Sequence, residues 1–493
     1  MSDPTRPVPN GRTGAGPIGA GQPTQIEPVE APARRADAKW VPKTLGAYDV
    51  LVVGGGPAGL AAAIAAHDTG SKVGLIEREG RLGGILKQCV HDGFGTIEFK
   101  THLTGPEYAE RFMVQAAGRG IASHLNTFVL GATRAASAAA SDSGTPAGNA
   151  RDSAHSKDGA NFVLAVENQN GIFNIKSKSL VLATGCRERT ARQVFIHGTR
   201  PAGIYSAGTA QYLVNVQGYL PGRKCVILGS GDVGLIMARR LTLEGSRVVA
   251  VYEAKPEPTG LARNISQCLD DYGIPLHLSH TVTRVFGDER VEAVEIAQCD
   301  KAMKPIAGTE RIVDCDCVIV AVGLIPENEL AEALGAEISV ATRGPQVDQT
   351  FQTSVPGLFA CGNCVHVHDL VDYVTESGRV AGRSAAEYAA GRRSAGLRTP
   401  IITSNSLLYA VPQLFDVGAA NEPFTVYFRS RNTHQDVVAR LVQNGEVLAE
   451  SRCAVVRPQQ MQAMAVGALS SVPNQNCSIN LDLSARQPGS RKE

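Results

Sequence analysis

The sequence predicts an α/β protein with two similar strand–turn–helix–strand units, followed by a smaller β-rich segment. Residues 48–79 and 223–254 repeat one order of an apolar run, a glycine turn, a helical stretch, a second apolar run and an acidic residue. Glycine is abundant, with 52 residues, and aromatic residues make up only 5%, which is typical of α/β domains with tight turns. Residues 400–470 instead show strand-like runs around an Asn444-Gly445 dipeptide, which is typical of a hairpin.

Length, charge and cysteine content exclude several classes of protein. A chain of 493 residues is too long for one ordinary core, so more than one domain is expected. The net charge is +1 without a dense basic run, which argues against nucleic acid as a partner. No apolar run reaches about 18 residues, so we expect no membrane span. Eleven cysteines lack a framework spacing and no signal segment is visible, so we expect reduced thiols and a cytoplasmic location.

The first glycine turn has the pattern of a dinucleotide site. Gly54 permits a tight turn, Gly56 lets a pyrophosphate approach the backbone, and Gly59 lets the helix pack on the strand. The helix that follows presents free N–H groups, which favour an anion. Glu77 ends the next strand, where a carboxylate can bind both hydroxyls of a ribose. The alternative is a glycine-rich turn that binds no ligand. It is disfavoured because the strand, the turn, the helix, the second strand and the acidic residue follow one another in the order of a dinucleotide site.

The second unit repeats the pattern at three glycines, Gly229, Gly231 and Gly234. Glu253 ends its strand, and a carboxylate there favours a free 2′-hydroxyl and hence NADH over NADPH. Lys255 and Arg247 are close enough in sequence to weaken that preference, so both cofactors stay open.

Two further stretches, at 179–189 and 316–330, are apolar strands that end in a small residue and a glycine. Such turns let the chain pass beneath a flat ligand, and they mark where the chain leaves one unit for the other. The predicted boundaries are a disordered tail at 1–46, the first unit at 47–204 with a flexible insertion at 135–159, the second unit at 205–322, a return to the first unit at 323–395, the β-rich segment at 396–472 and a disordered tail at 473–493.

In this order of motifs the chain resembles the flavoproteins with two dinucleotide-binding domains that are related to pyridine nucleotide–disulfide reductases. The motifs are GGGPAG, Glu77, GRLGGILKQC, ATGCRER, GSGDVG, Glu253, AVGLIPEN and VPGLFACGN, within residues 48–392. The stretches GGILKQCVHDGFG, LTGPEYAERF, IHGTRPAGIYSAGTAQ and CGNCVHVHDLVDYVTESG are more specific. They are similar to flavoprotein subunits of opine, sarcosine and cyanide-forming amine oxidases, and to the oxidoreductase found beside anaerobic-type glycerol-3-phosphate dehydrogenases.

The resemblance implies two Rossmann-like domains, with an FAD-binding domain split in sequence around an inserted NAD(P)-binding domain, plus the β-rich C-terminal domain. It implies FAD, NAD(P)H, a small-molecule substrate and a partner dehydrogenase or oxidase subunit, and it leaves a homo-oligomer open. We expect the FAD to be non-covalent, because no histidine or cysteine can be assigned to attachment. The residues implied for FAD are Gly54, Gly56, Pro57, Ala58, Gly59, Glu77, Arg78, Gly83, Gly84, Ala183, Thr184, Gly185, Gly362 and Asn363. Those implied for the nicotinamide cofactor are Gly229, Gly231, Asp232, Val233, Gly234, Glu253 and Gly323.

The stretch LFACGNCVHVHDLVDY at 358–373 allows three interpretations: a metal site, a redox cysteine pair or part of the FAD site. The family has Gly-Asp here, whose aspartate binds the ribityl chain, whereas this chain has Gly362-Asn363, a neutral partner. Zinc is disfavoured because structural zinc sites place the second ligand pair about a dozen residues on, so no metal is predicted. Cys361 and Cys364 could form an activated redox pair, but we expect small buried packing residues.

The resemblance also implies candidate catalytic residues near the flavin, namely Cys89, His91, His366, His368 and Asp369. A histidine there could stabilise charge or move a proton, or it could simply donate a structural hydrogen bond. The cysteine pairs of disulfide reductases and thioredoxin reductases are missing, and only Cys453 and Cys477 lie beyond residue 400. Neither a dithiol relay nor an iron–sulfur cluster is therefore expected.

The sequence thus predicts an FAD-dependent oxidoreductase that passes electrons between NAD(P)H, or a small amine or hydroxy substrate, and a partner subunit, without a redox-active disulfide. A stand-alone disulfide or peroxide reductase is one alternative, which the missing cysteine pair disfavours. A non-enzymatic subunit that binds flavin or nucleotide is the other.

Overall fold

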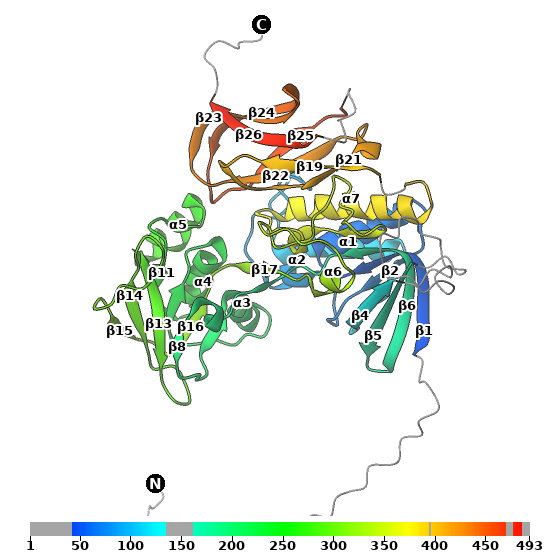
Figure 1. The fold of residues 1–493 in the computed structure, drawn as a ribbon. Helices are drawn as coiled ribbons and strands as arrows, with labels where there is room; N and C mark the ends of the chain where they lie inside the picture. Colours follow the sequence, from blue (N-terminus) through cyan, green and yellow to red (C-terminus); the bar gives the residue numbers. More distant parts are fainter. Residues whose placement is uncertain (1–41, 135–160, 394–395, 470–476, 486–493) are drawn as a thin grey trace, which may run out of the picture. The chain divides into compact units, whose positions relative to one another are not determined.

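The computed structural model describes residues 42–134, 161–393, 396–469 and 477–485. It contains both predicted strand–turn–helix–strand units and a β-rich C-terminal segment, which Figure 1 colours from blue through green to red. The predicted insertion at 135–159 and residues 1–41 of the predicted tail lie outside the described residues. None of the described helices is long and apolar enough to cross a membrane.

The first unit is built on a parallel sheet in the order β3-β2-β1-β6-β18. Its strands are β1 (Lys43–Val53), β2 (Val73–Ile76), β3 (Ala122–His124), β6 (Gly171–Leu182) and β18 (Leu358–Ala360). β4 (Phe128–Arg134) and β5 (Phe162–Asn168) extend β6 on one side as antiparallel strands. Because β18 comes from the second half of the chain and pairs with β6, the first unit is split in sequence, as predicted.

Strand β1 begins inside the segment predicted to be a tail at 1–46. Lys43 already pairs with Phe173 of β6, and the pairing continues to Val53. The sequence pattern does not reveal this start because Lys43–Ala47 contain one large apolar residue, Leu45, and are mostly exposed, so they lack the apolar run that marks the rest of the strand.

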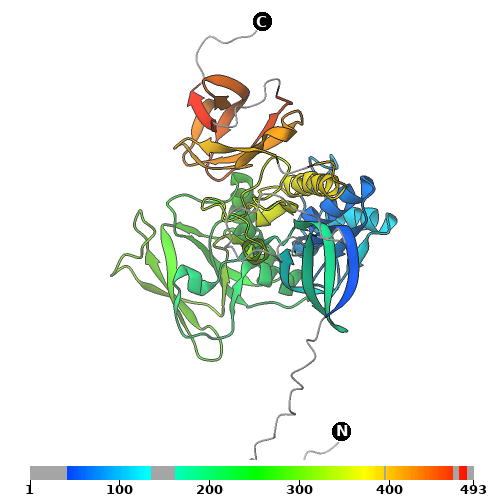
Figure 2. The same cartoon turned by 45° about the vertical axis from the view of Figure 1, so that its right-hand side comes forward.

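Helices α1 (Pro57–Asp68) and α7 (Val371–Ala389) lie side by side although they are far apart in sequence, as Figures 1 and 2 both show. A Cβ atom on Gly378 would lie 2.2 Å from the carbonyl oxygen of Ala58, and one on Gly382 would lie 2.1 Å from that of Ala62. Only glycine allows two backbones to come this close. Helix α7 is therefore fixed against the helix that follows the first glycine turn.

The second unit has a parallel sheet in the order β12-β11-β10-β16-β9. Its strands are β9 (Ile204–Ser206), β10 (Lys224–Leu228), β11 (Arg247–Glu253), β12 (Leu276–Leu278) and β16 (Cys317–Val320), and its helices are α3 (Ala207–Asn215), α4 (Asp232–Leu243) and α5 (Ala262–Cys268). A further sheet joins β15 (Arg311–Asp314), β14 (Ala293–Gln298), β13 (His280–Phe286) and β8 (His197–Gly198). Since β8 and β9 pair within this unit, it begins before residue 205; strands of two and three residues are too short to show an alternation.

The chain passes between the two units through β7 (Cys186–Glu188) and β17 (Leu324–Pro326), which pair antiparallel. The N–H of Arg189 donates to the carbonyl of Gly323 at 3.1 Å, and the N–H of Glu327 donates to that of Gly185 at 3.0 Å. The two predicted linking turns are therefore bonded to each other across one two-stranded ribbon.

The C-terminal segment contains two sheets, in the orders β21-β19-β26-β23-β24 and β20-β22-β25. The strands are β19 (Arg398–Thr403), β20 (Leu407–Val411), β21 (Leu414–Asp416), β22 (Phe424–Ser430), β23 (His434–Gln443), β24 (Glu446–Val456), β25 (Gln462–Val466) and β26 (Ile479–Ala485). Asn444 and Gly445 connect β23 to β24 with φ angles of 53° and 85°, which confirms the predicted hairpin turn.

Strand β26 corrects the prediction that residues 473–493 form a disordered tail. It lies between β19 and β23 in the middle of its sheet, and Ile479 and Leu481 are buried. The stretch alternates apolar and polar residues, which is the period of a half-buried strand. Its polar surroundings in the sequence hide that alternation.

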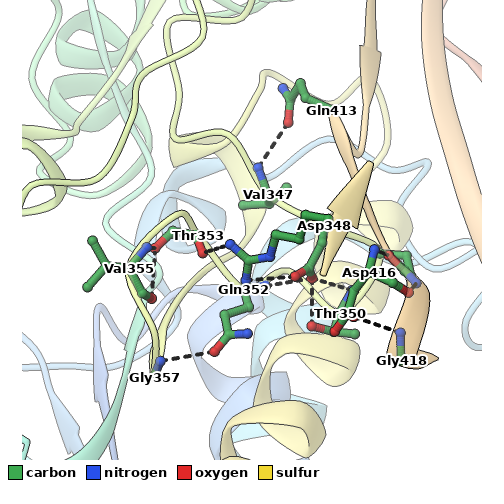
Figure 3. A network of polar contacts seen from close by, with 12 residues as sticks. Val347, Asp348, Thr350, Gln352, Thr353, Val355, Gly357, Gln413, Asp416 and Gly418 are labelled. Atoms are coloured by element: carbon green, nitrogen blue, oxygen red, sulfur yellow. Dashed lines mark hydrogen bonds and ion pairs between the residues drawn. The ribbon is translucent and has the colours of Figure 1, made fainter. Parts of the chain in front are cut away.

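A buried polar network bonds the C-terminal segment to the first unit (Figure 3). Asp348 is fully buried, and its Oδ2 atom lies 2.9 Å from Nη2 of Arg398 in β19. Its Oδ1 atom accepts from the N–H and hydroxyl of Thr350, at 2.9 and 2.6 Å. The side chain of Gln349 donates to the carbonyl of Asp416 at 2.7 Å and accepts from its N–H at 2.8 Å. The β-rich segment is therefore anchored to the first unit by buried polar side chains, which the apolar pattern of the strands does not predict.

Candidate active site

The three glycines of the first turn differ in their surroundings. A Cβ atom on Gly54, whose φ is +106°, would lie 2.3 Å from the carbonyl oxygen of Ala183, and one on Gly59 would lie 1.7 Å from that of Gly54. A Cβ on Gly56 would meet nothing nearer than the Cα atom of Gly84, at 3.9 Å. The first and third glycines serve the packing of the chain, while the second borders space that the protein leaves open. A phosphate requires such space at the start of the helix.

The second turn has the same arrangement. A Cβ atom on Gly229 would lie 2.2 Å from the carbonyl oxygen of Ala321, and one on Gly234 would lie 2.4 Å from that of Gly229. Around Gly231 the nearest atom is the hydroxyl of Thr259, at 3.8 Å. Both units therefore fit a dinucleotide at the same point of the turn.

Each turn is bonded to the acid that ends its second strand. The N–H of Gly55 donates to Oε2 of Glu77 at 2.7 Å, and the N–H of Ser230 donates to Oε2 of Glu253 at 3.0 Å. The hydroxyl of Ser230 also donates to Glu253, at 2.6 Å. Both carboxylates are nearly buried and held beside the turn, where the ribose of a dinucleotide would bind.

The positions of two basic residues bear on the choice between NADH and NADPH. Arg247 begins β11 and Glu253 ends it, so strand geometry separates their Cα atoms by about 20 Å. Arg247 therefore cannot reach a phosphate beside Glu253. Lys255 is exposed two residues beyond Glu253, so it alone of the two stays near the ribose position.

The predicted FAD residues from the first and last thirds of the chain converge on the first turn. The N–H of Gly83 donates to the carbonyl of Gly55 at 2.8 Å. A Cβ atom on Gly84 would lie 2.9 Å from the Cα of Gly56, and one on Gly362 would lie 2.8 Å from the Cβ of Ala58. Pro57 and Ala58 begin α1. These contacts assemble one cradle from three stretches of sequence.

The linking turns add the other predicted cofactor residues. Gly185 and Gly323 have φ angles of +74° and +101°, and a Cβ on either would meet nothing within 4 Å, so both border open space. The hydroxyl of Thr184 donates to the carbonyl of Glu327 at 2.7 Å, and Nη1 of Arg78 lies 4.0 Å from Oε2 of the same residue. Ala183 and Thr184 follow β6, on the side of the first turn.

Two predicted residues at the start of α4 have different surroundings. Oδ1 of Asp232 accepts from the N–H of Leu261 at 2.8 Å and from the amide of Asn264 at 2.7 Å. This carboxylate therefore fixes the start of α5. Val233 is 44% exposed.

Cys89 and His91 follow the short helix η1 (Gly84–Gln88). Burial raises the pKa of the Cys89 thiol to about 12, and its Sγ atom lies 3.7 Å from Oε1 of Gln211 in α3. A thiol with that pKa stays protonated at neutral pH and is a poor nucleophile. The ring of His91 packs on Phe94 with centroids 4.9 Å apart.

His366 and His368 lie together in the loop before α7, which we call the histidine loop (residues 363–369). Their ring centroids are 3.9 Å apart, and they are 1% and 8% exposed. Oδ1 of Asn363 accepts from the backbone N–H of His368 at 3.1 Å and lies 3.3 Å from its Nδ1. Burial lowers the pKa of His368 to about 3 and that of His366 well below its usual value, so both rings are neutral at pH 7.

Three of the four ring nitrogens in this pair are buried without a partner in the described part of the chain: both of His366 and Nε2 of His368. An unpaired buried polar group costs about 1–3 kcal/mol. Such a cluster calls for a polar group from outside the protein. No hydrogen bond or ring contact joins this pair to Cys89 or His91 in residues 42–134 and 161–393, so the structure does not bring these candidates together.

The cysteines of this stretch are buried like the histidines. Cys361 and Cys364 are 0% and 1% exposed, and burial raises the pKa of both thiols. The Cys364 thiol donates to the carbonyls of Cys361 and Leu182, at 3.1 and 3.3 Å. Within the described ranges, no three His, Cys, Asp or Glu side chains are placed to hold a metal ion. The two thiols pack in the core beside β18.

Sequence reasoning does not reveal the residues that the C-terminal segment brings to the histidine loop. Tyr409 and Tyr427 pack on His366, with ring centroids 5.8 and 5.7 Å apart. Arg429 pairs with Asp369. The sequence contains one weak indication of this group: Tyr427 and Arg429 are two residues apart in one strand, so their side chains lie on the same face of the sheet.

Comparison with known proteins identifies the class. The family model described as pyridine nucleotide-disulphide oxidoreductase matches residues 48–385, and this chain belongs to that family. Thioredoxin reductases from Lactococcus lactis and T. acidophilum have the same fold, with TM-scores of 0.54 and 0.52 at 19% and 20% identity. Each comparison covers 70% of this chain and 99% of the other.

The curated relatives include components of larger enzymes. An opine oxidase subunit of Agrobacterium tumefaciens is 24% identical over 361 residues, which is 69% of this chain and 64% of that protein. The hydrogen cyanide synthase subunit HcnB of Pseudomonas protegens is 25% identical over 317 residues, 60% of each chain. This chain thus spans between 60% and 64% of the length of these relatives. NADH oxidase of Methanocaldococcus jannaschii is 27% identical over 248 residues, 46% of this chain and 51% of that one.

Membership of the family confirms the predicted resemblance and fold class. The family is that of the pyridine nucleotide-disulphide oxidoreductases, and the two glycine turns fit the predicted FAD and NAD(P)H.

The assignment of the first turn to FAD predicts a specific loss in Glu77→Ala. The variant is expected to bind FAD about ten- to a hundredfold more weakly, because a charged hydrogen-bond acceptor contributes about 1.5–3 kcal/mol. Titration of the apo-protein with FAD measures the affinity, and Glu77→Gln, which keeps the acceptor without the charge, should lie between. Acid precipitation should release the flavin into the supernatant. A yellow pellet would contradict the non-covalent prediction, and unchanged affinity would remove the ribose assignment.

Proposed function

We propose that this chain is the flavoprotein component of an electron-transfer system. It passes electrons between NAD(P)H, or a small amine or hydroxy substrate, and a partner dehydrogenase or oxidase subunit, without a redox-active disulfide. The observation that carries the proposal is the repeated glycine turn: in both units the second glycine borders open space beside a held carboxylate. Two dinucleotides can then bind to one chain whose linking turns are bonded together.

Different residues of the first unit would bind different parts of FAD. The turn at Gly54, Gly56 and Gly59 would hold the pyrophosphate, with Glu77 on the ribose. When bound, the flavin supplies a two-electron acceptor and donor. His366 and His368 are the groups proposed to stabilise charge on the bound cofactor, because an imidazole that stays neutral at pH 7 can donate from a ring N–H but is a poor proton acceptor.

The state of the cysteines supports electron exit without a thiol relay. All cysteines are free. Burial raises the pKa of Cys89 to about 12 and that of Cys186 to about 11, and a relay needs an accessible thiolate. Free thiols also support a reducing, cytoplasmic compartment.

The relatives support a partner subunit. The similar proteins of opine oxidase and hydrogen cyanide synthase are each named as one subunit of an enzyme. The fold shared with thioredoxin reductases favours a second candidate function, a disulfide reductase, so the experiment must separate the two.

Anaerobic addition of NADH is expected to bleach the visible flavin band of the purified protein. Reoxidation should be fast with an artificial dye and slow with oxidised thioredoxin or glutathione. Efficient turnover of a disulfide would support the reductase instead. If neither NADH nor NADPH reduces the flavin, the nicotinamide assignment of the second turn is wrong.

Gly231→Ala is the matched variant. A Cβ atom fits the protein there, since the nearest atom is 3.8 Å away, and the φ of −65° suits alanine. The variant should keep its fold and its FAD, but the methyl group would enter the space proposed for the second pyrophosphate. Bleaching should then require far more NADH. Normal NADH dependence would contradict the location of that site.

A further inference from the structure

The histidine loop is enclosed by side chains of the C-terminal segment. Tyr427 in β22 lies 5.7 Å from the ring centroids of both His366 and His368, and Tyr409 in β20 lies 5.8 Å from His366. Tyr373 in α7 also packs on Tyr427, with ring centroids 5.4 Å apart. Because most ring nitrogens of the pair have no partner in the described part of the chain, these ring contacts are what hold the imidazoles in place.

An ion pair fastens the end of the same loop. Oδ1 of Asp369 accepts from Nη2 of Arg429 at 2.5 Å, and its Oδ2 accepts from the N–H of Met461 at 2.5 Å. Both carboxylate oxygens are thus bonded to the C-terminal segment. The side chains of Arg429 and Asp369 are 17% and 33% exposed, so the pair is partly shielded from water.

Arg429 is itself fixed by its surroundings. Its Nε donates to the hydroxyl of Tyr409 at 3.2 Å, and its Nη1 donates to the carbonyl of Pro458 at 3.1 Å. It lies in β22, the middle strand of its sheet, between β20 and β25. A planar guanidinium can serve three acceptors in a set geometry, which a lysine cannot. Arg429 therefore fixes the carboxylate of Asp369 relative to the sheet of β20, β22 and β25.

These residues lie beyond the part of the chain that the family model matches, which ends at residue 385. The C-terminal segment is also bonded to the first unit elsewhere, through the network around Asp348. It is thus held to the first unit at places other than the histidine loop as well.

We infer that the C-terminal β segment encloses one side of the active site. Arg429 is then a positioning residue that holds the histidine loop through Asp369. The inference rests on the proposed function in one respect, the action of the histidines beside the flavin. The docking of the loop does not depend on it.

Arg429→Met tests this inference, with Arg440→Met as the control. Arg440 in β23 makes a similar pair, with its Nε 3.2 Å from Glu450 and its Nη1 2.7 Å from the hydroxyl of Ser484, and does not touch the loop. Asp369→Asn is a second variant that removes the charge with little change of shape. Arg429→Lys keeps the charge and should restore part of the wild-type behaviour.

The first readout is modification of histidines by diethyl pyrocarbonate, mapped by mass spectrometry on the peptide with His366 and His368. Wild type and Arg440→Met should protect this peptide. Arg429→Met and Asp369→Asn should expose it, with modification about tenfold faster or more, because the rate follows the population of locally opened loop. This readout needs no turnover, so it stands even if NADH fails to reduce the flavin.

The second readout is reduction of a dye by NADH. In Arg429→Met, kcat is expected to fall while the KM for NADH stays unchanged, because the second glycine turn is not altered. Equal protection of the peptide in all variants would overturn the inference. So would equal exposure in Arg429→Met and Arg440→Met, since the effect would then be a general loss of stability. A changed KM with an unchanged kcat would also contradict it.

Discussion

Asp348→Ala is expected to lower the free energy of unfolding of the first unit and the C-terminal segment by about 3–5 kcal/mol, because it leaves Arg398 buried without its carboxylate. Asp348 is 0% exposed and the side chain of Arg398 is 15% exposed. Their atoms are 2.9 Å apart but are not aligned as a hydrogen bond, so the attraction is electrostatic. The variant also removes the acceptor for the N–H and hydroxyl of Thr350 (Figure 3).

Urea denaturation followed by circular dichroism measures this loss. Burial raises the pKa of Asp348 in spite of Arg398, so the pair does not recover its full desolvation cost. The double variant Asp348→Asn with Arg398→Met should therefore be much less destabilised than the sum of the single variants. Glu244→Ala, at an exposed pair with Arg240, is the control and should cost about 0.5 kcal/mol or less. A loss in Asp348→Ala as small as in this control would contradict the structural role of the network.

Gly59→Ala and Gly56→Ala are expected to separate folding from cofactor binding. In Gly59→Ala the new methyl group would lie 1.7 Å from the carbonyl oxygen of Gly54, so the turn must break and the variant should lose both stability and FAD. At Gly56 the φ of −75° suits alanine and the nearest atom is 3.9 Å away. Gly56→Ala should therefore melt like wild type, yet bind FAD about a hundredfold more weakly, which corresponds to two steps of roughly 1.4 kcal/mol.

Thermal melting of the apo-proteins and titration with FAD give the two quantities independently. Normal FAD affinity in Gly56→Ala would mean that the open space beside this residue is not the pyrophosphate site. A fully stable Gly59→Ala would mean that the close approach of helix and strand can relax.

The sequence correctly predicts those parts of the fold that are determined by residues close to one another in the chain. The three glycines that determine each glycine turn lie within six residues of one another in sequence. The two residues that determine the hairpin turn, Asn444 and Gly445, are adjacent. The linking turns are predictable for the same reason, because Gly185 and Gly323 need left-handed φ angles just where an apolar strand ends.

The parts that sequence reasoning misses depend on contacts between distant residues. Strand β26 is stable because it completes a sheet between β19 and β23, which its own composition does not show. Tyr427 lies far from His366 in sequence and reaches it only after the C-terminal segment has docked. Arg247 is close to Glu253 in sequence, but a strand places its two ends far apart.

The antiparallel ribbon of β7 and β17 has a consequence for the history of the chain. Glu188 pairs with Leu324, so the chain leaves the first unit and re-enters it at neighbouring points. A short hairpin turn could close that gap, at the cost of the hydrogen bonds that Gln88, Cys89 and Glu188 make to α3 and to Ser206 before it. The second unit is in this sense a single insertion into the first unit. Changes within the second unit can therefore leave the sheet of the first unit intact, because the strands of that sheet lie before and after the insertion in sequence.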